Sequence, residues 1–126
     1  MVSRSDPESV VVREILVWAR YDPRVRLWRN DVRPGGVGLG RGVSGLGPGS
    51  PDLVGHVVMT LPDGRRIARA LYVECKRPGG GVLSPAQIAW LDQARRDGAI
   101  VVVARDVADV IEAVDQAVTM ASMAGR

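Results

Sequence analysis

Two runs of residues with strand-like composition, 52–60 and 66–76, are separated by the pentapeptide Leu61-Pro62-Asp63-Gly64-Arg65. Proline at the second turn position, followed by Asp-Gly, is typical of a tight turn, because proline fixes its own φ and glycine tolerates positive φ. We therefore predict a β-hairpin folded about Asp63. This prediction constrains the fold, since it brings the start of the first run beside the end of the second.

Two carboxylates and the only lysine of the chain fall at the open end of this hairpin. Asp52 follows Pro51 at the start of the first strand, and Glu74 and Lys76 come at the end of the second. Folding about Asp63 places Asp52 opposite position 74, and side-chain alternation puts Glu74 and Lys76 on one face. Sixteen of the seventeen basic residues are arginine, so lysine occurs only where a compact, rotatable ammonium would matter.

Neighbouring carboxylates repel each other and attract a cation. Asp52 and Glu74 therefore predict a site for a hard divalent ion with oxygen ligands, most simply Mg²⁺. Such an ion polarises a phosphoryl oxygen and acidifies a bound water, and Lys76 would position that water and offset charge in the transition state. The alternative is a solvated Glu-x-Lys pair with no catalytic role.

Helix caps and apolar periodicity mark the remaining elements. Asp6, Ser84 and Asp106 can each accept a hydrogen bond from the first turn of a helix. The resulting order of helix, strand, hairpin, helix, strand and helix predicts an α/β fold with a mixed central sheet flanked by helices. The expected segments are helices from 7 to 21, from 85 to 97 and from 107 onward, and strands 25–30, 52–60, 66–76 and 99–104.

Residues 34–51 contain eight glycines and three prolines and predict a long loop. Residues 40–45 match Gly-x-Gly-x-x-Gly, but no helix pattern follows, which excludes a dinucleotide-binding fingerprint. Residues 20–69 carry nine arginines against four aspartates, a balance that favours a phosphate-binding face. The alternative is a solvated face. The residues we assign to nucleic-acid binding are Arg29, Asn30, Arg33 and Arg41.

Length and composition set further bounds. The 126 residues, with a formal net charge of +3, predict one domain spanning residues 1–126, with 34–50 as an insertion. A single cysteine and a single histidine exclude an intramolecular disulfide and a His/Cys metal cluster, and favour a reducing, cytoplasmic location. No apolar run reaches the length of a membrane span, and no signal peptide is visible.

Three further side chains have both a functional and a structural interpretation. Glu8 is a third candidate metal ligand, but an acid in a first helical turn also interacts with the helix dipole. Gln87 could orient Lys76 or a DNA phosphate, or complete a capping box with Ser84. Cys75 faces away from the acidic site, so we interpret its thiol as core and its carbonyl as a possible metal ligand. We expect core or interface positions for Trp18, Trp28 and Trp90, and a structural role for His56.

The chain resembles the VRR-NUC family, the virus-type replication–repair nucleases of the PD-(D/E)xK superfamily. The likeness covers residues 7–115, and the motifs stand in the order found in the family. The segments that carry it are Glu8-Ser9-Val10-Val11, Trp28-Arg29-Asn30, Gly49-Ser50-Pro51-Asp52-Leu53, Tyr72-Val73-Glu74-Cys75-Lys76 and Leu83-Ser84-Pro85-Ala86-Gln87.

The resemblance implies a restriction-endonuclease-like αβββαβ(α) core and a Mg²⁺- or Mn²⁺-dependent DNA endonuclease. It implies a metal held by Asp52, Glu74 and the carbonyl of Cys75, with Glu8 binding directly or through water. Catalysis would fall to Asp52, Glu74 and Lys76, with Gln87 in support. Small standalone members resemble structure-specific phage enzymes that act on branched DNA in replication and repair, often as homodimers.

Two features depart from the family pattern. The segment from Asp31 to Gly49 is long and glycine-rich, which leaves substrate geometry open, and Cys75 replaces the usual branched aliphatic residue. Two other functions also stay open. One is a non-catalytic nucleic-acid-binding module that keeps the nuclease fold, and the other is an interaction domain that uses residues 107–118 as a partner surface.

Overall fold

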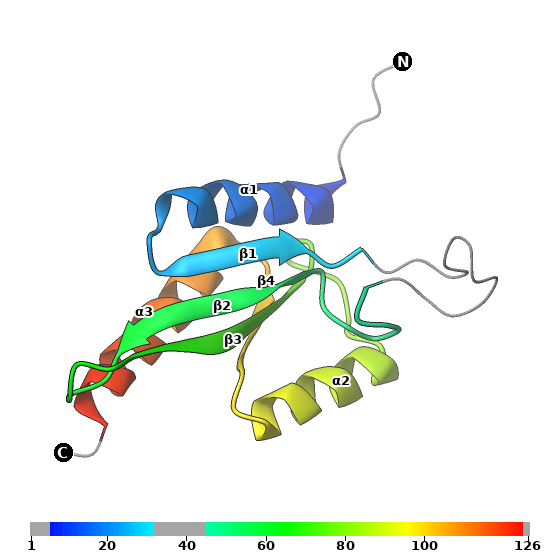
Figure 1. Ribbon diagram of the computed structural model, residues 1–126. Coiled ribbons are helices and arrows are strands. Elements are labelled where there is room, and N and C mark those ends of the chain that lie inside the picture. The colour runs from blue at the N-terminus through cyan, green and yellow to red at the C-terminus, as the bar shows by residue number, and fades with distance from the viewer. Residues whose placement is uncertain (1–5, 32–44, 125–126) are drawn as a thin grey trace, which may run out of the picture.

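The computed structural model describes residues 6–31 and 45–124 and has the predicted order of elements (Figure 1). The chain forms a mixed α/β fold, with a four-stranded sheet flanked by helices, consistent with a restriction-endonuclease-like core. Arg33 and Arg41 lie outside the described residues. The elements are α1 (Pro7–Tyr21), β1 (Val25–Arg29), β2 (Leu53–Thr60), β3 (Arg66–Cys75), α2 (Pro85–Arg96), β4 (Ile100–Ala104) and α3 (Val107–Met123).

The strands follow the spatial order β1-β2-β3-β4. The first two neighbouring pairs are antiparallel, and β3 pairs with β4 in parallel, so α2 forms the crossover between them. In the β2–β3 hairpin Leu53 lies opposite Val73 and Thr60 opposite Arg66, a register folded about Asp63 as predicted. One step beyond the Leu53 pair, Asp52 and Glu74 come to the same end of the sheet.

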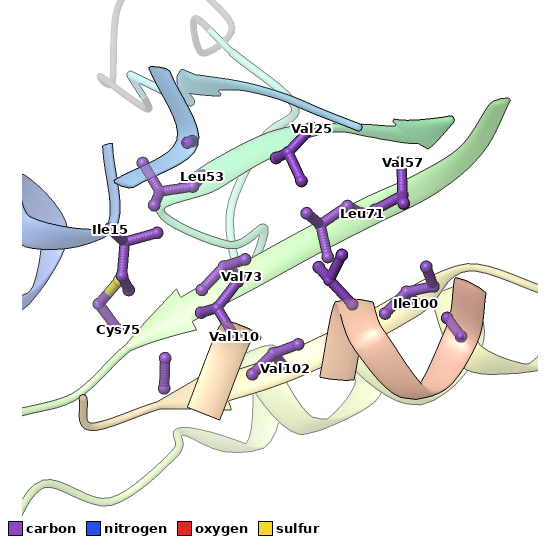
Figure 2. Packing of buried hydrophobic residues seen from close by; sticks show 14 of the residues in the cluster. Ile15, Val25, Leu53, Val57, Leu71, Val73, Cys75, Ile100, Val102 and Val110 are labelled. Atoms are coloured by element: carbon purple, nitrogen blue, oxygen red, sulfur yellow. The ribbon is translucent and has the colours of Figure 1, made fainter. Parts of the chain in front are cut away.

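The hydrophobic core lies between one face of the sheet and helices α1 and α3 (Figure 2). Alternate residues of each strand point into it, which is why the buried positions repeat every second residue. Helix α2 lies on the opposite side of the sheet from α1 (Figure 1). Val110 and Val114 of α3 are fully buried in the core, so these valines do not form a partner surface.

Local hydrogen bonds explain where the helices begin. Asp6 accepts from the backbone N–H of Ser9 at 2.8 Å, Asp106 accepts from that of Ala108, and Ser84 caps α2. These three predicted caps are confirmed. Across residues 6–31 and 45–124, no helix combines the length and the apolar character that crossing a membrane requires.

The three tryptophans have different surroundings. Trp18 packs partly buried against the core, and Trp90 of α2 meets Tyr72 of β3 edge to face, with ring centroids 4.9 Å apart. Trp28 of β1 is 56% exposed, so of the two predicted positions, core or interface, it does not take the core one, and the interface position stays a prediction. Its ring points away from the core, next to His56 of β2 at a centroid distance of 6.1 Å.

Candidate active site

Four predicted site residues meet at one end of the sheet. Asp52 precedes β2, Glu74 lies near the end of β3, Lys76 follows β3, and Gln87 lies in the first turn of α2. The carboxylate of Asp52 accepts a hydrogen bond from the backbone N–H of Cys75 at 2.8 Å. This bond fixes the start of β2 against the end of β3 and holds Asp52 beside Glu74.

Glu74 and Lys76 form a buried ion pair. Glu74 is 2% exposed and Lys76 is 8% exposed, and Lys76 Nζ lies 3.3 Å from Glu74 Oε2. The backbone N–H of Lys76 donates to the carbonyl of Ala104, which attaches the residue to the end of β4. Buried ion pairs are weak evidence for stability because desolvation offsets their attraction, so this pair favours a functional interpretation over a solvated surface pair.

The surroundings of Glu74 disfavour its negative charge. Burial, and then repulsion from Asp52, raise the pKa of Glu74 to about 7, while the neighbouring ammonium of Lys76 acts in the opposite direction. Two neighbouring carboxylates, with one ammonium against Glu74, leave negative charge in a poorly solvated place. Oxygen donors of this kind fit a hard divalent cation such as Mg²⁺ or Mn²⁺.

Gln87 links the ion pair to the start of α2. Its Nε2 donates to Glu74 Oε2 at 2.8 Å, and its Oε1 lies 3.2 Å from Lys76 Nζ. The same Oε1 accepts from the backbone N–H of Ser84, and the backbone N–H of Gln87 donates to Ser84 Oγ. The side chain therefore completes the predicted capping box with Ser84 and also contacts both charged groups.

Asn30 holds the segment that leads to Asp52. Its Nδ2 donates to Ser50 Oγ at 2.7 Å and to the carbonyl of Pro51 at 2.8 Å, and its Oδ1 accepts from the N–H of Leu46. Its backbone N–H donates to the carbonyl of Asp52. The amide assigned to nucleic-acid binding is thus engaged by the chain itself, and it positions the strand entry.

Close approach also fixes this segment against α2. Gly49 has a φ of +81°, and a Cβ at this position would lie 2.7 Å from the carbonyl oxygen of Ala86. Only glycine meets both requirements. The segment before Asp52 and the start of α2 therefore come together, which brings Gln87 to the acidic pair.

Arg105 is a neighbour of the site that the sequence did not reveal. It follows β4, and its guanidinium donates to the carbonyls of Arg77, Gly80 and Gly81. These carbonyls belong to the loop that comes directly after Lys76, and Gly81 packs against the Lys76 side chain. No local motif marks this role, because the contacts span more than twenty residues.

The other predicted metal ligands are less tightly gathered. Glu8 is partly buried at the start of α1, and Cys75 is buried in the core. Burial, and then the charges of Asp52 and Glu74, raise the pKa of the Cys75 thiol, which makes it a poor nucleophile. Among the residues that the structure describes, no group of three or more His, Cys, Asp or Glu side chains is arranged to hold a metal ion.

Comparison with known families matches a model described as the VRR-NUC domain to residues 27–108, well over half of the chain. The match includes Asp52, Glu74, Lys76 and Gln87, and it begins after Glu8. No curated protein and no solved structure gives a significant match.

Proposed function

Because the chain belongs to the VRR-NUC family of nucleases, we propose that it is a metal-dependent DNA endonuclease that hydrolyses phosphodiester bonds in branched or junction DNA. The observation that carries this proposal is the buried Glu74–Lys76 pair beside Asp52 at one end of the sheet. A packed core gains little from such a cluster, whereas phosphoryl transfer needs opposed charges held in a fixed place.

Asp52 and Glu74 would hold Mg²⁺ or Mn²⁺, with the Cys75 carbonyl and Glu8 as further ligands, Glu8 directly or through water. When bound, the cation supplies charge neutralisation at the phosphate and acidification of water. These carboxylates otherwise repel phosphate, which is the reason to prefer an enzyme over a binding module that does not cleave.

Lys76 would donate hydrogen bonds to the attacking water and balance the negative charge that develops on the phosphate oxygens. Its neighbours support this role, since Gln87 Oε1 and Glu74 Oε2 lie 3.2 and 3.3 Å from Nζ. Arginine could not replace it, because a planar guanidinium directs its donors in a fixed fork. Arg29, with Arg33 and Arg41, would bind DNA phosphates, while Asn30 would keep Asp52 in position.

The test is cleavage of labelled single-stranded, flap, splayed and four-way-junction DNA by the wild-type chain with Mg²⁺, Mn²⁺ or EDTA. We expect metal-dependent cutting that Asp52→Ala, Lys76→Ala and Lys76→Arg each abolish. Arg96→Gln is the matched control for the loss of a cation, because Arg96 is the last residue of α2. This variant should cut DNA like the wild type. Thermal unfolding of each variant checks that the fold is intact.

Turnover like that of the wild type in Lys76→Ala would contradict the site assignment. Tight DNA binding without cutting in any metal would favour the non-catalytic module. We also propose that two copies act together on branched DNA, and sedimentation of the protein with and without a four-way junction tests this point separately.

A further inference from the structure

A groove of about 650 Å³ follows β1 and the C-terminal end of α1. β1 is an edge strand, since its one partner in the described sheet is β2, and it lies beneath α1 in Figure 1. Leu16 and Ala19 of α1 line the groove. Its lining also includes three arginines and two aromatic residues, namely Arg20, Tyr21, Arg26, Trp28 and Arg29.

The cations of this groove are available to a ligand. None of Arg20, Arg26 and Arg29 forms an ion pair with a carboxylate in the described part of the chain. The one acid of the groove, Asp22, is neutralised by Arg24 at 2.8 Å. Three guanidinium groups with no carboxylate partner among the described residues favour a polyanion, and phosphates are the natural match.

The aromatic side chains point to unpaired bases. Tyr21 is 83% exposed and Trp28 is 56% exposed, although both belong to residue types that usually bury most of their area. Tyr21 lies at the end of α1, and the ring of Trp28 lies on the outer face of β1 beside His56, so the two rings flank the basic groove. Exposed aromatic rings beside a basic groove form the arrangement on which bases of a single strand stack. In duplex DNA the bases already stack on one another, so these rings would gain nothing there.

The open edge of β1 is protected against pairing with another strand. The carbonyl of Arg24 accepts from the N–H of Val58 in β2, and the N–H of Asn30 donates to the carbonyl of Asp52 just before β2. The alternate groups of Val25 and Leu27 therefore face away from the sheet. Arg26 Nη1 donates to the carbonyls of Val25 and Pro23. A charged side chain over an edge carbonyl opposes addition of a strand, which argues against a second copy of the chain as the occupant.

The groove is continuous with the proposed active site. Arg29 lines both this groove and a hollow of about 490 Å³ that contains Pro51 and Asp52. From that hollow, β1 extends for roughly 16 Å towards Tyr21. A strand leaving the scissile phosphate could therefore follow β1 to the end of α1.

We propose that this groove binds a single-stranded segment of the nucleic-acid substrate next to the cleavage point. Its phosphates contact Arg20, Arg26 and Arg29, and its bases stack on Trp28 and Tyr21. The proposal rests on the nuclease function above and narrows it, because it makes a junction between duplex and single strand the preferred substrate.

The experiment uses the full chain carrying Lys76→Ala, so that DNA is bound without being cut. Fluorescence anisotropy compares a labelled duplex that has a single-stranded tail with a blunt duplex of the same sequence. We expect Trp28→Ala and Tyr21→Ala to weaken binding of the tailed duplex by about fivefold or more and to leave binding of the blunt duplex unchanged. Trp28→Phe should keep most of the affinity, because it retains a stacking ring.

The arginines are tested by salt dependence. Arg26→Gln should lower the slope of log affinity against log salt by about one for the tailed duplex, and Arg96→Gln on α2 should leave the slope unchanged. Equal affinity for tailed and blunt duplexes, unaffected by Trp28→Ala, would overturn the proposal. So would a dimer that Trp28→Ala dissociates, since a second copy would then occupy the groove.

The two proposals can fail separately. The wild-type chain could cut DNA and lose this activity in Lys76→Ala, while Trp28→Ala and Tyr21→Ala bind the tailed duplex normally. That result would contradict the groove proposal and support the nuclease proposal. If binding of the tailed duplex depends on Trp28 but no metal supports cutting, the groove proposal would be supported and the nuclease proposal contradicted.

Discussion

Gln87 takes part in two sets of hydrogen bonds, and substitution can separate them. Ser84→Ala removes the cap alone and should lower the free energy of unfolding by about 1 kcal/mol, with cleavage nearly unchanged. Gln87→Ala also removes the contacts with Glu74 and Lys76, so its cleavage should fall by about 10- to 100-fold. Urea unfolding and initial cleavage rates of both variants check this prediction. An equal loss of activity in the two variants would contradict it.

The catalytic candidates could be predicted because their positions depend on one turn. A hairpin folded about Asp63 brings Asp52 to Glu74 by counting alone, and alternation adds Lys76. The sequence could place Asn30 at the site but could not predict its structural role. Its side-chain amide bonds to Leu46, Ser50 and Pro51 across a long connection. Such contacts depend on how the connection folds back, which no local pattern records.

At the scale of elements, Arg105 joins the end of β4 to the loop after β3. We predict that Arg105→Lys keeps the charge but loosens residues 77–81, because one ammonium cannot reproduce a fork that reaches three carbonyls. Hydrogen exchange should quicken at Gly80 and Gly81, and cleavage should fall with little change in KM, since Lys76 would lose a rigid neighbour.

Arg95→Lys on α2 is the control for Arg105→Lys, because the Arg95 side chain pairs with Asp92 at the surface and bonds to no carbonyl of residues 77–81. If hydrogen exchange of residues 77–81 is unchanged in Arg105→Lys, the loop is rigid without the Arg105 contacts and the prediction is wrong.

Arg24 connects the turn between α1 and β1 to α3. Its guanidinium lies 2.8 Å from Asp22 and 2.9 Å from Asp115, and its hydrogen bonds lower the pKa of Asp22. A carboxyl whose folded pKa is lowered stabilises the fold above the ordinary pKa of about 3.9, and this contribution is lost as the pH falls through the folded pKa. Asp22→Ala should therefore lower the free energy of unfolding by about 1 kcal/mol at pH 7.

The same difference between Asp22→Ala and wild type should shrink below about pH 4. Urea unfolding at pH 7, 5 and 3 measures it. Asp115→Ala is the companion variant, with a smaller expected effect, because the Asp115 side chain is 57% exposed and exposed pairs contribute little. A loss in Asp22→Ala that does not vary with pH would mean that packing, not charge, is responsible.

At the scale of the whole molecule, the order of elements could be predicted and the coverage of the sheet could not. Asp6, Ser84 and Asp106 are local signals, and each marked a helix correctly. Trp28 shows why this coverage could not be predicted. Alternation along a strand assigns its side chains to the two faces of the sheet but does not indicate whether helices cover one face or both. Here α2 packs on the second face beside β3 and β4, where Trp90 meets Tyr72, and Trp28 of β1 is 56% exposed.

The acidic site should also set how the stability of the whole chain responds to metal. Repulsion between Asp52 and Glu74 disfavours the folded state, and a cation that binds only the folded state stabilises it by mass action, by about 2.7 kcal/mol at one hundred times Kd. We predict that Mn²⁺ or Mg²⁺ raises the Tm of the wild-type chain by several degrees and that EDTA reverses the rise. Asp52→Asn keeps an acceptor for the Cys75 N–H but removes one charge, so its Tm without metal should equal or exceed that of the wild type and should not respond to metal. NaCl at matched ionic strength controls for screening. An equal rise in both proteins would locate metal binding away from this pair, whatever the cleavage assay reports.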